Sequence, residues 1–534
     1  MHRHVVAILL AAIVAGAEEP THEGKTANEW VPLLSDKDAA VRAQAATALG
    51  FVGMGFDKAI PSLQRVAKDK DAAVREAAGA ALDRILGEIT WKQRRDAKER
   101  DRLVARGGGG KATEEAVLSA LGWLARHQEA DGRWSATDFA KHCEKSTCDG
   151  LGIAAHDYGL TGLAVLAFLG AGIVPDPAAK GSQLVDAVAG GVQWLLAHQA
   201  KDGMISAPSD SHCLYHHALG TMALCETYGM TRDQALRPNA EAAVRFLVDA
   251  KNPARAWRYQ PKSGENDVSA TGWCLMALKS ASMAGIKVPP YAWCDVYAYL
   301  GEATDPKSLK VGYTGAQTAG VKVVSPGKND LFAGHDTMTA IAVLGRLTVA
   351  RDAKDPWVKA AAPLLAADLP AWDDSTKPMD YYYWYYGTLA LFQHGRGEGA
   401  DLWKRWNAAL TKTLLESQKD GNAACGRGSW DPCDRWGFEG GRIYATAMNA
   451  LSLEVYYRYA DSLALGKRVD VDLPADPVME AREKLARELV NQGIQSEKKR
   501  NRAEAIRVYT EASTTYPETK AGKEAASRLK SLGK

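Results

Sequence analysis

The chain has 534 residues, 46% of them hydrophobic, and a formal net charge of +2 at pH 7. Its length is too great for one ordinary domain, and its hydrophobic content excludes a disordered chain. Because the charges nearly balance, the composition gives no reason to expect a nucleic acid as a partner.

The N-terminal residues predict an export signal. After Met1-His-Arg-His, an uninterrupted apolar run extends from Val5 to Ala15, and small residues lead up to Ala17. The run is too short to span a bilayer, and the small residues suit cleavage after Ala17. Residues 1–17 are therefore a predicted signal peptide. We expect the mature chain to have no membrane span and to act in the periplasm or at the cell surface.

A short repeat follows the predicted signal peptide. The segment Ser35–Arg42 recurs 33 residues later as Lys68–Arg75, and each copy precedes an alanine-rich amphipathic stretch. The pattern Asp-x-x-Val-Arg-x-x-Ala resembles the HEAT family, in which stacked helix pairs share a continuous core. We expect HEAT-like repeats and a charged helix over residues 25–106, and a glycine-rich hinge at residues 107–111.

Residues 112–465 carry a second recurring motif. Trp123, Gln128, Gly132 and Trp134 show the spacing aromatic-Leu-x3-Gln-x3-Gly-x-Trp, which resembles the QW motif of squalene-hopene and oxidosqualene cyclases. Weaker copies begin at Trp194, Phe246 and Leu415. The resemblance implies that these residues tie the end of an outer helix to the turn that follows. They therefore identify a fold and not an activity.

Apolar segments with a 3.6-residue period follow these outer helices. Six candidate inner helices begin near Asp157, Cys213, Asp267, His335, Asp380 and Gly440. Six inner and six outer helices would close a double ring. The predicted fold class is all-α, an α6/α6 toroid similar to squalene cyclases and protein prenyltransferases, flanked by short helical-repeat segments.

The starts of the inner helices supply the candidate catalytic residues, which are Asp157, Asp267, His335 and Asp380. Four residues further on, the equivalent positions are Thr161, His217, Thr271, Thr339, Trp384 and Tyr444. If the ring closes, both tiers surround one mouth of its cavity, where carboxylates and histidines could bind a cation or transfer a proton. The simpler interpretation is that each aspartate is a helix N-cap.

Candidate ligand-binding residues at this mouth are His217, Trp257, Tyr381, Trp384 and Tyr444. Aromatic rings there could stack on a sugar or a lipid, or stabilise a carbocation. The run from Tyr381 to Tyr386 contains six consecutive aromatic residues, which point to all sides of a helix, so most of them are expected in the core.

An oxidising compartment makes disulfides the simplest use of two cysteine pairs. Cys143 and Cys148 bracket one short polar loop, and Cys425 and Cys433 bracket another. His212 and His216 would share a helical face, but no carboxylate lies at a spacing that would complete a metal site. We predict disulfides in both loops, no metal site and no cofactor.

The last segment, residues 476–534, resembles a tetratricopeptide unit with its capping helix, from Ala503-Glu-Ala-Ile-Arg-Val-Tyr and Tyr516-Pro517. Such units, like HEAT repeats, bind partner proteins or cap an assembly. We therefore expect a protein partner on one of these two segments.

The catalytic motifs of the resembling families are missing. The toroid has no Asp-x-Asp-Asp acid, and no histidine follows His394 to complete the prenyltransferase zinc site that Asp431-Pro-Cys433 would begin. We therefore favour a binding or scaffolding function, with a hydrophobic or glycan ligand in the cavity or a partner protein on the repeats. The alternative is an enzyme that acts in the cavity on an isoprenoid or a polysaccharide, as a cyclase, lyase or hydrolase.

Overall fold

The structure is a computed structural model of the chain. It describes residues 19–56, 58–143, 147–207, 209–318, 323–325, 328–330, 336–352, 354–372, 379–420, 425–459 and 473–533. The predicted signal peptide and the candidate residue His335 lie outside these ranges. The chain divides into two compact units, residues 1–85 and 86–534, and the boundary falls within one helix, α4 (Ala72–Arg95).

The first unit contains a two-stranded hairpin and packed helices. The elements are β1 (Thr21–His22), β2 (Lys25–Thr26), α1 (Ala27–Leu33), α2 (Ala39–Val52), α3 (Ala59–Val66) and the first half of α4. The two strands are antiparallel.

The repeated Asp-x-x-Val-Arg pattern has the same structural role in both copies. Asp38 and Asp71 each accept the N–H two residues further on, at 2.9 Å, and so cap the start of a helix. Arg42 and Arg75 each donate to two backbone carbonyls of the loop before their helix. Arg42 also forms a bidentate pair with Asp69, with both N–O distances at 2.8 Å, which joins the two copies.

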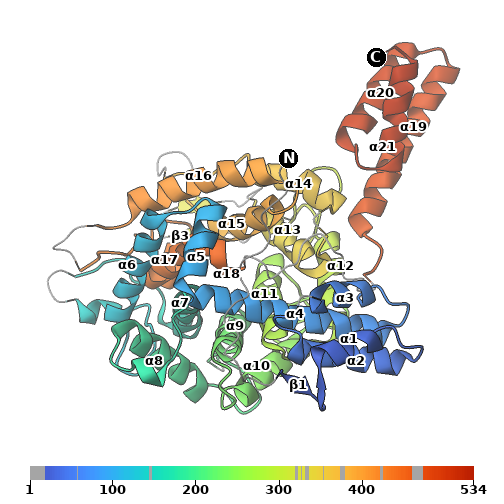
Figure 1. Ribbon diagram of the computed structural model, residues 1–534. Coiled ribbons are helices and arrows are strands. Elements are labelled where there is room, and N and C mark those ends of the chain that lie inside the picture. Colours follow the sequence, from blue (N-terminus) through green and yellow to red (C-terminus); the bar gives the residue numbers. More distant parts are fainter. Residues whose placement is uncertain are drawn as a thin grey trace, which may run out of the picture. The chain divides into compact units, whose positions relative to one another are not determined.

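Six inner helices close a ring in the second unit. They are α7 (Asp157–Gly170), α9 (Cys213–Thr231), α11 (Val268–Ala284), α13 (Thr337–Ala350), α15 (Tyr381–Gly395) and α17 (Gly437–Leu453). Each contacts the next in this order, and α17 contacts α7 (Figure 1). The predicted α6/α6 toroid is confirmed.

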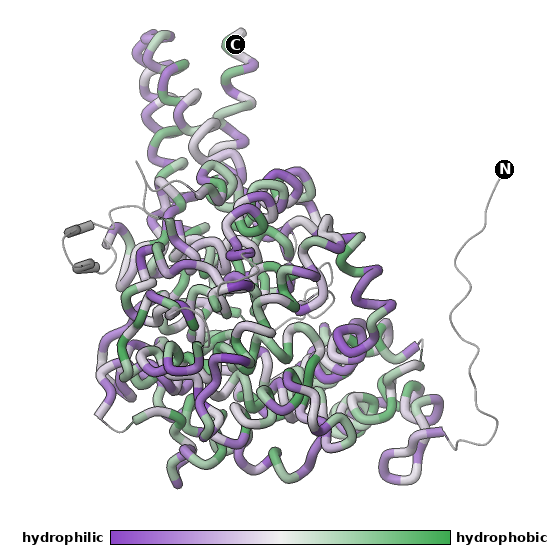
Figure 2. Tube along the Cα trace, turned by 90° about the vertical axis from the view of Figure 1, so that its left-hand side faces the viewer, coloured by the Kyte–Doolittle hydropathy of each residue, from purple (hydrophilic) through white to green (hydrophobic). Residues whose placement is uncertain are grey.

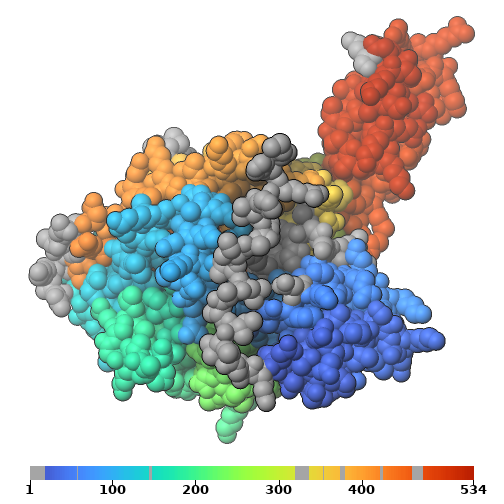
Figure 3. Space-filling model, in the orientation of Figure 1, coloured from blue at the N-terminus to red at the C-terminus, as the bar shows by residue number. Residues whose placement is uncertain are grey.

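Six outer helices surround this ring. They are α6 (Lys111–Arg126), α8 (Gln183–Ala197), α10 (Arg237–Ala250), α12 (Pro290–Glu302), α14 (Pro356–Leu365) and α16 (Ala400–Ser417). Each packs on an inner helix, and α16 contacts α6, where the orange and light-blue surfaces meet in Figure 3. We call the junction of α16 and α17 with α6 and α7 the seam.

The pattern of buried residues differs between the outer and the inner helices, because the two layers have different neighbours. α10 buries Ala240, Ala243, Val244 and Leu247, a spacing that places all four on one face of an outer helix. The inner helix α11 instead buries every residue from Val268 to Ala281, because neighbours surround it on all sides. The apolar inner segments recognised in the sequence are therefore the core of the toroid.

After each of four outer helices, one long polar side chain forms hydrogen bonds that hold the following turn in place. Nε2 of Gln128 donates to the carbonyl of Gly132 in its own turn at 2.7 Å and to that of Ala187 in α8 at 2.8 Å. The indole N–H of Trp134 donates back to the carbonyl of Leu124 at 2.8 Å, which fixes the turn to the end of α6. The QW-like residues thus have the structural role that the resemblance implies.

The same bridge recurs around the ring. Gln199 reaches α10, and Lys251 bonds its own turn and pairs with Asp295 of α12. Gln418, which follows α16, donates to the carbonyl of Ala116 in α6 at 2.8 Å. Because α6 is the first outer helix and α16 the last, Gln418 closes the outer layer at the seam.

Aromatic side chains fill the interior of the ring. The ring centroid of Trp273 on α11 lies 5.5 Å from that of Tyr385 and 5.3 Å from that of Tyr386, both on α15. Since α13 stands between α11 and α15 in the ring, these contacts cross the lumen. Both tyrosines are fully buried, so the lumen is packed at this level.

Buried charges occupy the end of the lumen where the inner helices finish. Arg94, from the second half of α4, lies 2.7 Å from the carboxylate of Glu226 on α9. Arg458, in α18 (Val455–Arg458), lies 3.6 Å from the same carboxylate. These three side chains are almost completely buried, so an ion-pair network closes this end.

The glycines predicted as a hinge lie in a close contact. A Cβ atom on Gly107 or Gly109 would lie 2.5 or 2.6 Å from the ring of Tyr456 in α18. Gly108, at φ +94°, ends α5 (Ala97–Gly107) in the left-handed conformation that glycine favours. Glycine is needed here for packing and for a turn.

The remaining elements are short or C-terminal. They are η1 (Phe139–His142), η2 (Ala154–His156), η3 (Pro177–Ala179), the antiparallel pair β3 (Val323–Ser325) and β4 (Lys328–Asp330), α19 (Pro477–Lys498), α20 (Arg502–Thr515) and α21 (Lys520–Ser531). The last three helices pack together around Tyr509, and purple and green alternate along them in Figure 2, as in amphipathic helices. No helix in the described ranges is long and apolar enough to cross a membrane.

The bridging glutamines should make a measurable contribution to stability. Gln418→Ala removes two hydrogen bonds, one to Gly428 in its own turn and one across the seam to Ala116, and should lower the stability of the toroid by about 1–3 kcal/mol. The shift of the urea midpoint measures this effect. Gln234→Ala is the matched control, because this exposed side chain bonds only the carbonyl of Arg232 nearby in its own turn. Equal midpoints for the two variants would contradict the bridging role.

Candidate active site

The inner helices begin at one end of the ring, which we call the mouth. Contacts between successive N-terminal ends define it, such as Tyr215 of α9 with Ser269 of α11, and Thr337 of α13 with Asp380 before α15. The mouth therefore collects the N-terminal residues of all six inner helices, where the candidate catalytic residues were predicted.

Asp267 and Asp380 are helix N-caps. Asp267 accepts the N–H of Ala270 at 2.6 Å, and Asp380 accepts that of Tyr383 at 2.8 Å. Burial raises the pKa of Asp267 to about 7 and that of Asp380 to about 6. Oδ2 of Asp267 lies 4.0 Å from Nε of Arg258, too far for a close ion pair to offset the burial.

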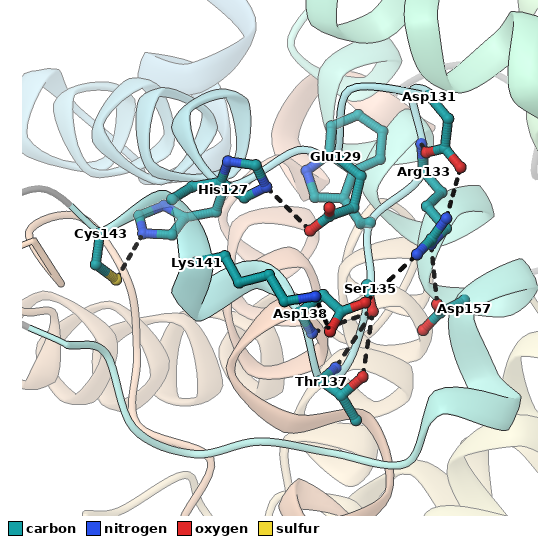
Figure 4. Close-up of polar contacts among 12 residues, drawn as sticks. His127, Glu129, Asp131, Arg133, Ser135, Thr137, Asp138, Lys141, Cys143 and Asp157 are labelled. Atoms are coloured by element: carbon teal, nitrogen blue, oxygen red, sulfur yellow. Dashed lines mark hydrogen bonds and ion pairs between the residues drawn. The ribbon is translucent and has the colours of Figure 1, made fainter.

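Asp157 turns away from its own helix. Its carboxylate accepts the N–H of Ala136 at 2.8 Å and lies 3.3 Å from Nε of Arg133 (Figure 4). Arg133 also pairs with Asp131 at 2.5 Å, so this cluster joins α7 to the turn after α6. Asp157 thus holds the turn in place, and burial raises its pKa.

The second tier mostly supports the outer turns. Thr161, His217 and Thr339 accept the N–H of Trp134, Ile205 and Val311, each the residue that ends a turn. His217 is fully buried, and its Nε2 lies 3.0 Å from the carbonyl of Ala243. Burial lowers the pKa of His217 to about 4. These side chains point outward from the lumen.

The other candidate binding residues are also engaged in the fold. Trp257 is fully buried, and its indole N–H donates to the carbonyl of Leu247 at 2.8 Å. Trp384 is 4% exposed and packs against Tyr381, whose hydroxyl donates to the carbonyl of Asp431 at 2.8 Å. These contacts make the three aromatic candidates part of the core.

Tyr444 lies beside a second buried carboxyl group. Its hydroxyl donates to Oδ2 of Asp434 at 3.3 Å, and the N–H of Tyr381 donates to the same oxygen at 3.1 Å. Burial raises the pKa of Asp434 well above its ordinary range, and the nearby charge of Asp380 raises it further. A pair of buried acids therefore lies on the α15–α17 side of the mouth.

Four side chains from three repeats form a hydrogen-bonded chain on the other side. Nε2 of His156 lies 2.7 Å from Oε2 of Glu439, and its Nδ1 lies 3.0 Å from Nε2 of His216. Nδ1 of His216 pairs with Asp210. The exposed fraction of the side chains falls from 39% and 18% at Glu439 and His156 to 5% and 3% at His216 and Asp210. We call these four residues the relay, and it leads from solvent into the protein.

The two imidazole rings of the relay form a path for protons. In each ring, one nitrogen faces a carboxylate and the other faces the second ring. A proton that binds one nitrogen of an imidazole can be released from the other, so the two rings can pass a proton along the chain. The relay can therefore deliver or accept a proton at its exposed end.

The buried end of the relay is held as an anion. Burial raises the pKa of Asp210, but the hydrogen bond and the charge of His216 lower it more, to about 2. Ser206 donates to the same carboxylate at 3.0 Å, and the N–H of His212 donates at 2.8 Å. An ionised Asp210 fixes the orientation and the tautomer of His216, as the carboxylates that bond to catalytic histidines do.

Aromatic residues continue the wall beyond the relay. His212 packs against Tyr259 with ring centroids 4.6 Å apart, and the hydroxyls of Tyr259 and Tyr313 lie 2.6 Å apart. Tyr259 is only partly buried. The mouth therefore offers ring faces and hydroxyl groups beside the relay.

A chain of hydroxyl groups crosses the lumen at the level of the first helical turns. Tyr215 donates to Oγ of Ser269 at 2.7 Å, and that oxygen lies 2.8 Å from the hydroxyl of Tyr382. These residues come from α9, α11 and α15 and lie above the packed aromatic layer. They form the floor of the mouth.

The sequence analysis did not identify most of the relay. His156, Asp210 and Glu439 were not candidates, and His212 and His216 were considered only as metal ligands. The available signal was local: Asp210, His212 and His216 lie within seven residues of the sequence, around the start of an inner helix. Their partners come from distant parts of the chain, which no spacing could show.

The predicted disulfides are wrong. All eight cysteines lie in the described ranges, and none of them forms a disulfide. Cys425 lies beside His127, with Sγ and Nε2 3.2 Å apart, and not beside Cys433. Cys433 lies 3.6 Å from the hydroxyl of Tyr381. The spacing within each loop suggested local pairs, but the fold directs these side chains to other partners.

A surface pocket of about 240 Å³ lies far from the relay. It is lined by residues of α5, α15, α16 and α18, among them Arg106, Arg396 and Trp403. These residues surround the C-terminal end of α15, about 20 Å along that helix from the mouth. The lining contains arginines and aromatic rings but no carboxylate or histidine. Its position and chemistry make it a poor candidate for acid–base catalysis.

Comparison with known proteins identifies one kind of helical repeat in the chain. A family model of HEAT repeats matches residues 27–122. A comparison with curated proteins gives no match.

Similar solved structures include an inactive variant of an alpha-1,6-mannanase of Salegentibacter sp. with alpha-1,6-mannotriose, at 8% identity and a TM-score of 0.45, covering 65% of this chain and 99% of that one. A UGL variant with dGlcA-Glc-Rha-Glc is 13% identical, with a TM-score of 0.45 and coverages of 65% and 97%. A type II terpene cyclase from Scytonema with merosterolic acid A is 14% identical, with a TM-score of 0.37 and coverages of 66% and 98%. The assignment of the toroid depends on its closed ring of helix contacts and not on these scores.

The raised pKa of Asp267 predicts a pH-dependent stability. Because the carboxyl has a pKa of about 7 when folded and about 3.9 when unfolded, its favourable contribution is complete below pH 4 and is lost as the pH rises through 7. Asp267→Asn keeps an oxygen for the N–H of Ala270 but does not titrate. From pH 4 to pH 8 the variant should therefore gain up to about 4 kcal/mol relative to wild type.

Urea unfolding of both proteins across this pH range measures the difference. Asp267→Ala, which also removes the cap, should cost about 1 kcal/mol more than Asp267→Asn at every pH. A constant difference between wild type and Asp267→Asn from pH 4 to pH 8 would show that the carboxyl titrates normally in the folded chain.

Proposed function

We propose that this chain is an exported enzyme that acts on a polysaccharide by general acid–base chemistry at the mouth of the toroid. The observation that carries the proposal is the relay of Glu439, His156, His216 and Asp210, with its continuous contacts and its graded exposure. Export depends on the predicted signal peptide at residues 1–17.

A purely structural explanation of the relay is less economical. The same three repeats are already held together by backbone hydrogen bonds, such as that from the N–H of Ile153 to the carbonyl of Glu439 at 2.7 Å. Burying two imidazoles and a carboxylate costs free energy unless every group is paired. A linear relay that ends at solvent supports proton transfer better than it supports packing.

The pKa values of the mouth support the same interpretation. Asp210 is held as an anion at neutral pH, whereas Asp267 and Asp380 keep their protons to higher pH. Environments that shift the pKa values of similar groups in opposite directions are typical of acid–base sites. We assign proton transfer with the substrate to His156, because it is the exposed imidazole, and assign its support to His216 and Asp210.

The shape of the mouth favours a polymer over an isoprenoid. Trp273, Tyr385 and Tyr386 fill the lumen below the floor, which leaves little room to fold a long hydrocarbon chain inside the ring. A glycan could instead lie across the mouth, with its hydroxyls on the floor and its apolar face on a partly exposed ring such as Tyr259.

Binding without chemistry is the second candidate function. The match to HEAT repeats over residues 27–122 supports it, because stacked helical repeats commonly present surfaces to partner proteins. A scaffold of this kind would have no use for the relay.

The test is to replace the relay histidines and to measure cleavage of mannan, xylan, polygalacturonate and hyaluronan by the mature protein. New reducing ends report hydrolysis, and products with ultraviolet absorbance report elimination. His156→Gln and His216→Gln should each lower the rate on the responsive polysaccharide at least about 100-fold, because general acid–base catalysis contributes about 10² to 10⁴.

His198→Gln is the matched control and should keep the full rate. His198 is an exposed histidine at the end of α8, and its ring bonds the carbonyl of Trp194. Circular dichroism and melting curves establish that each variant is folded. Full activity in both relay variants would refute the catalytic role, and binding of a polysaccharide without any product would favour the second candidate.

A further inference from the structure

A cluster of one histidine and three cysteines lies outside the mouth. His127 follows α6, Cys143 and Cys148 flank the loop after η1, and Cys425 lies between α16 and α17. One ligand atom from each residue lies within 4.8 Å of the others. His127 and Cys148 are buried, and Cys143 and Cys425 are partly buried. The sequence had predicted a disulfide for each of these three cysteines.

The distances fit a tetrahedral metal site. Nε2 of His127 lies 3.2 Å from Sγ of Cys425, 3.6 Å from Sγ of Cys143 and 3.8 Å from Sγ of Cys148. Zinc–sulfur bonds of about 2.3 Å and zinc–nitrogen bonds of about 2.0–2.1 Å place such atoms about 3.6 Å apart in a tetrahedron. A disulfide would need two sulfurs about 2.05 Å apart, and none of the eight cysteines forms one.

The imidazole is oriented as a ligand. Nδ1 of His127 lies 2.8 Å from the carbonyl of Trp123, so this nitrogen carries the proton and Nε2 presents its lone pair to the sulfurs. The ring also stacks on Trp123, with centroids 4.2 Å apart, and meets the edge of Phe139. Figure 4 shows His127 pointing toward Cys143.

The surroundings suit bound thiolates. The N–H of Cys148 lies 3.2 Å from Sγ of Cys143, as a donor to a thiolate would.

We propose that His127, Cys143, Cys148 and Cys425 bind one zinc ion that clamps the first repeat of the toroid to the last. Four protein ligands leave no open position, which is the arrangement of structural and not of catalytic zinc. Three thiolates and one imidazole in a tetrahedron also favour zinc over the harder divalent cations.

The position of the cluster explains why a clamp would be useful. Across the seam, Gln418 bonds the carbonyl of Ala116, and Arg126 donates to the carbonyl of Arg427 at 3.1 Å. These are single hydrogen bonds between the two ends of a ring that the chain itself does not close covalently. A metal with ligands from both ends would replace that missing link.

The experiment measures metal in the full-length mature chain, purified without chelators from zinc-supplemented medium. Elemental analysis should find about one zinc per chain in wild type and less than about a tenth of that in Cys143→Ser and Cys425→Ser. Cys433→Ser is the matched control and should keep the zinc, because this exposed cysteine of the same loop points away from His127.

Two further measurements do not depend on folded variants. Adding Co²⁺ to the chelator-treated wild type should produce intense thiolate-to-cobalt absorption together with the visible bands of a tetrahedral site. The same chelator treatment should lower the melting temperature of wild type and of Cys433→Ser by roughly 5 °C or more.

Three results would overturn the proposal. The first is wild-type protein without zinc and without a cobalt spectrum, and the second is equal zinc in Cys143→Ser and wild type. The third is an intact mass and peptide map of the native protein that show Cys143, Cys148 or Cys425 in a disulfide, since the thiols would then serve the oxidised linkage expected from the sequence.

Discussion

The toroid depends on a side chain that bonds its own turn and the next outer helix at the same time. Gln128 and Gln418 do this with one amide group, and Lys251 does it with an ammonium group and a carboxylate partner on α12. The exchange of Gln for Lys shows that the requirement is the bridge and not the amide. Because the bridges fix the spacing of the repeats, the inner helices all begin at one level, and that level is the mouth.

The two ends of the lumen have different chemistry for a physical reason. At the C-terminal ends of the inner helices, the buried carboxylate of Glu226 lies beside Arg94 and Arg458, whose charges outweigh the effect of burial and lower its pKa. At the mouth, Asp267 and Asp380 are buried with backbone N–H groups as hydrogen-bond partners, and burial raises the pKa of both.

Local spacing predicted the fold well and the site poorly. The QW-like spacing predicted the turns correctly. Asp267 and Asp380 are N-caps, as expected for an aspartate at the start of a helix. The alignment of α17 placed Tyr444 in the second tier, but Thr446 accepts the N–H of Trp430, because Gly441 at φ +61° interrupts the helix and shifts the register. The relay and the cysteine cluster join residues that are far apart in sequence, so only the closed ring brings them together.

The seam connects stability with the proposed activity. Glu439 belongs to the last repeat and His156 to the first, so the exposed end of the relay exists only where the ring closes. The N–H of Arg442 donates to the carbonyl of Gly150 at 2.8 Å, and the loop that holds Gly150 begins at Cys148 of the proposed clamp. A chain that opened at the seam would keep five of the six contacts between inner helices but would lose the pairing of Glu439 with His156. The relay would then end at an unpaired imidazole, and a proton passed to that ring would have no anion beside it at the solvent end.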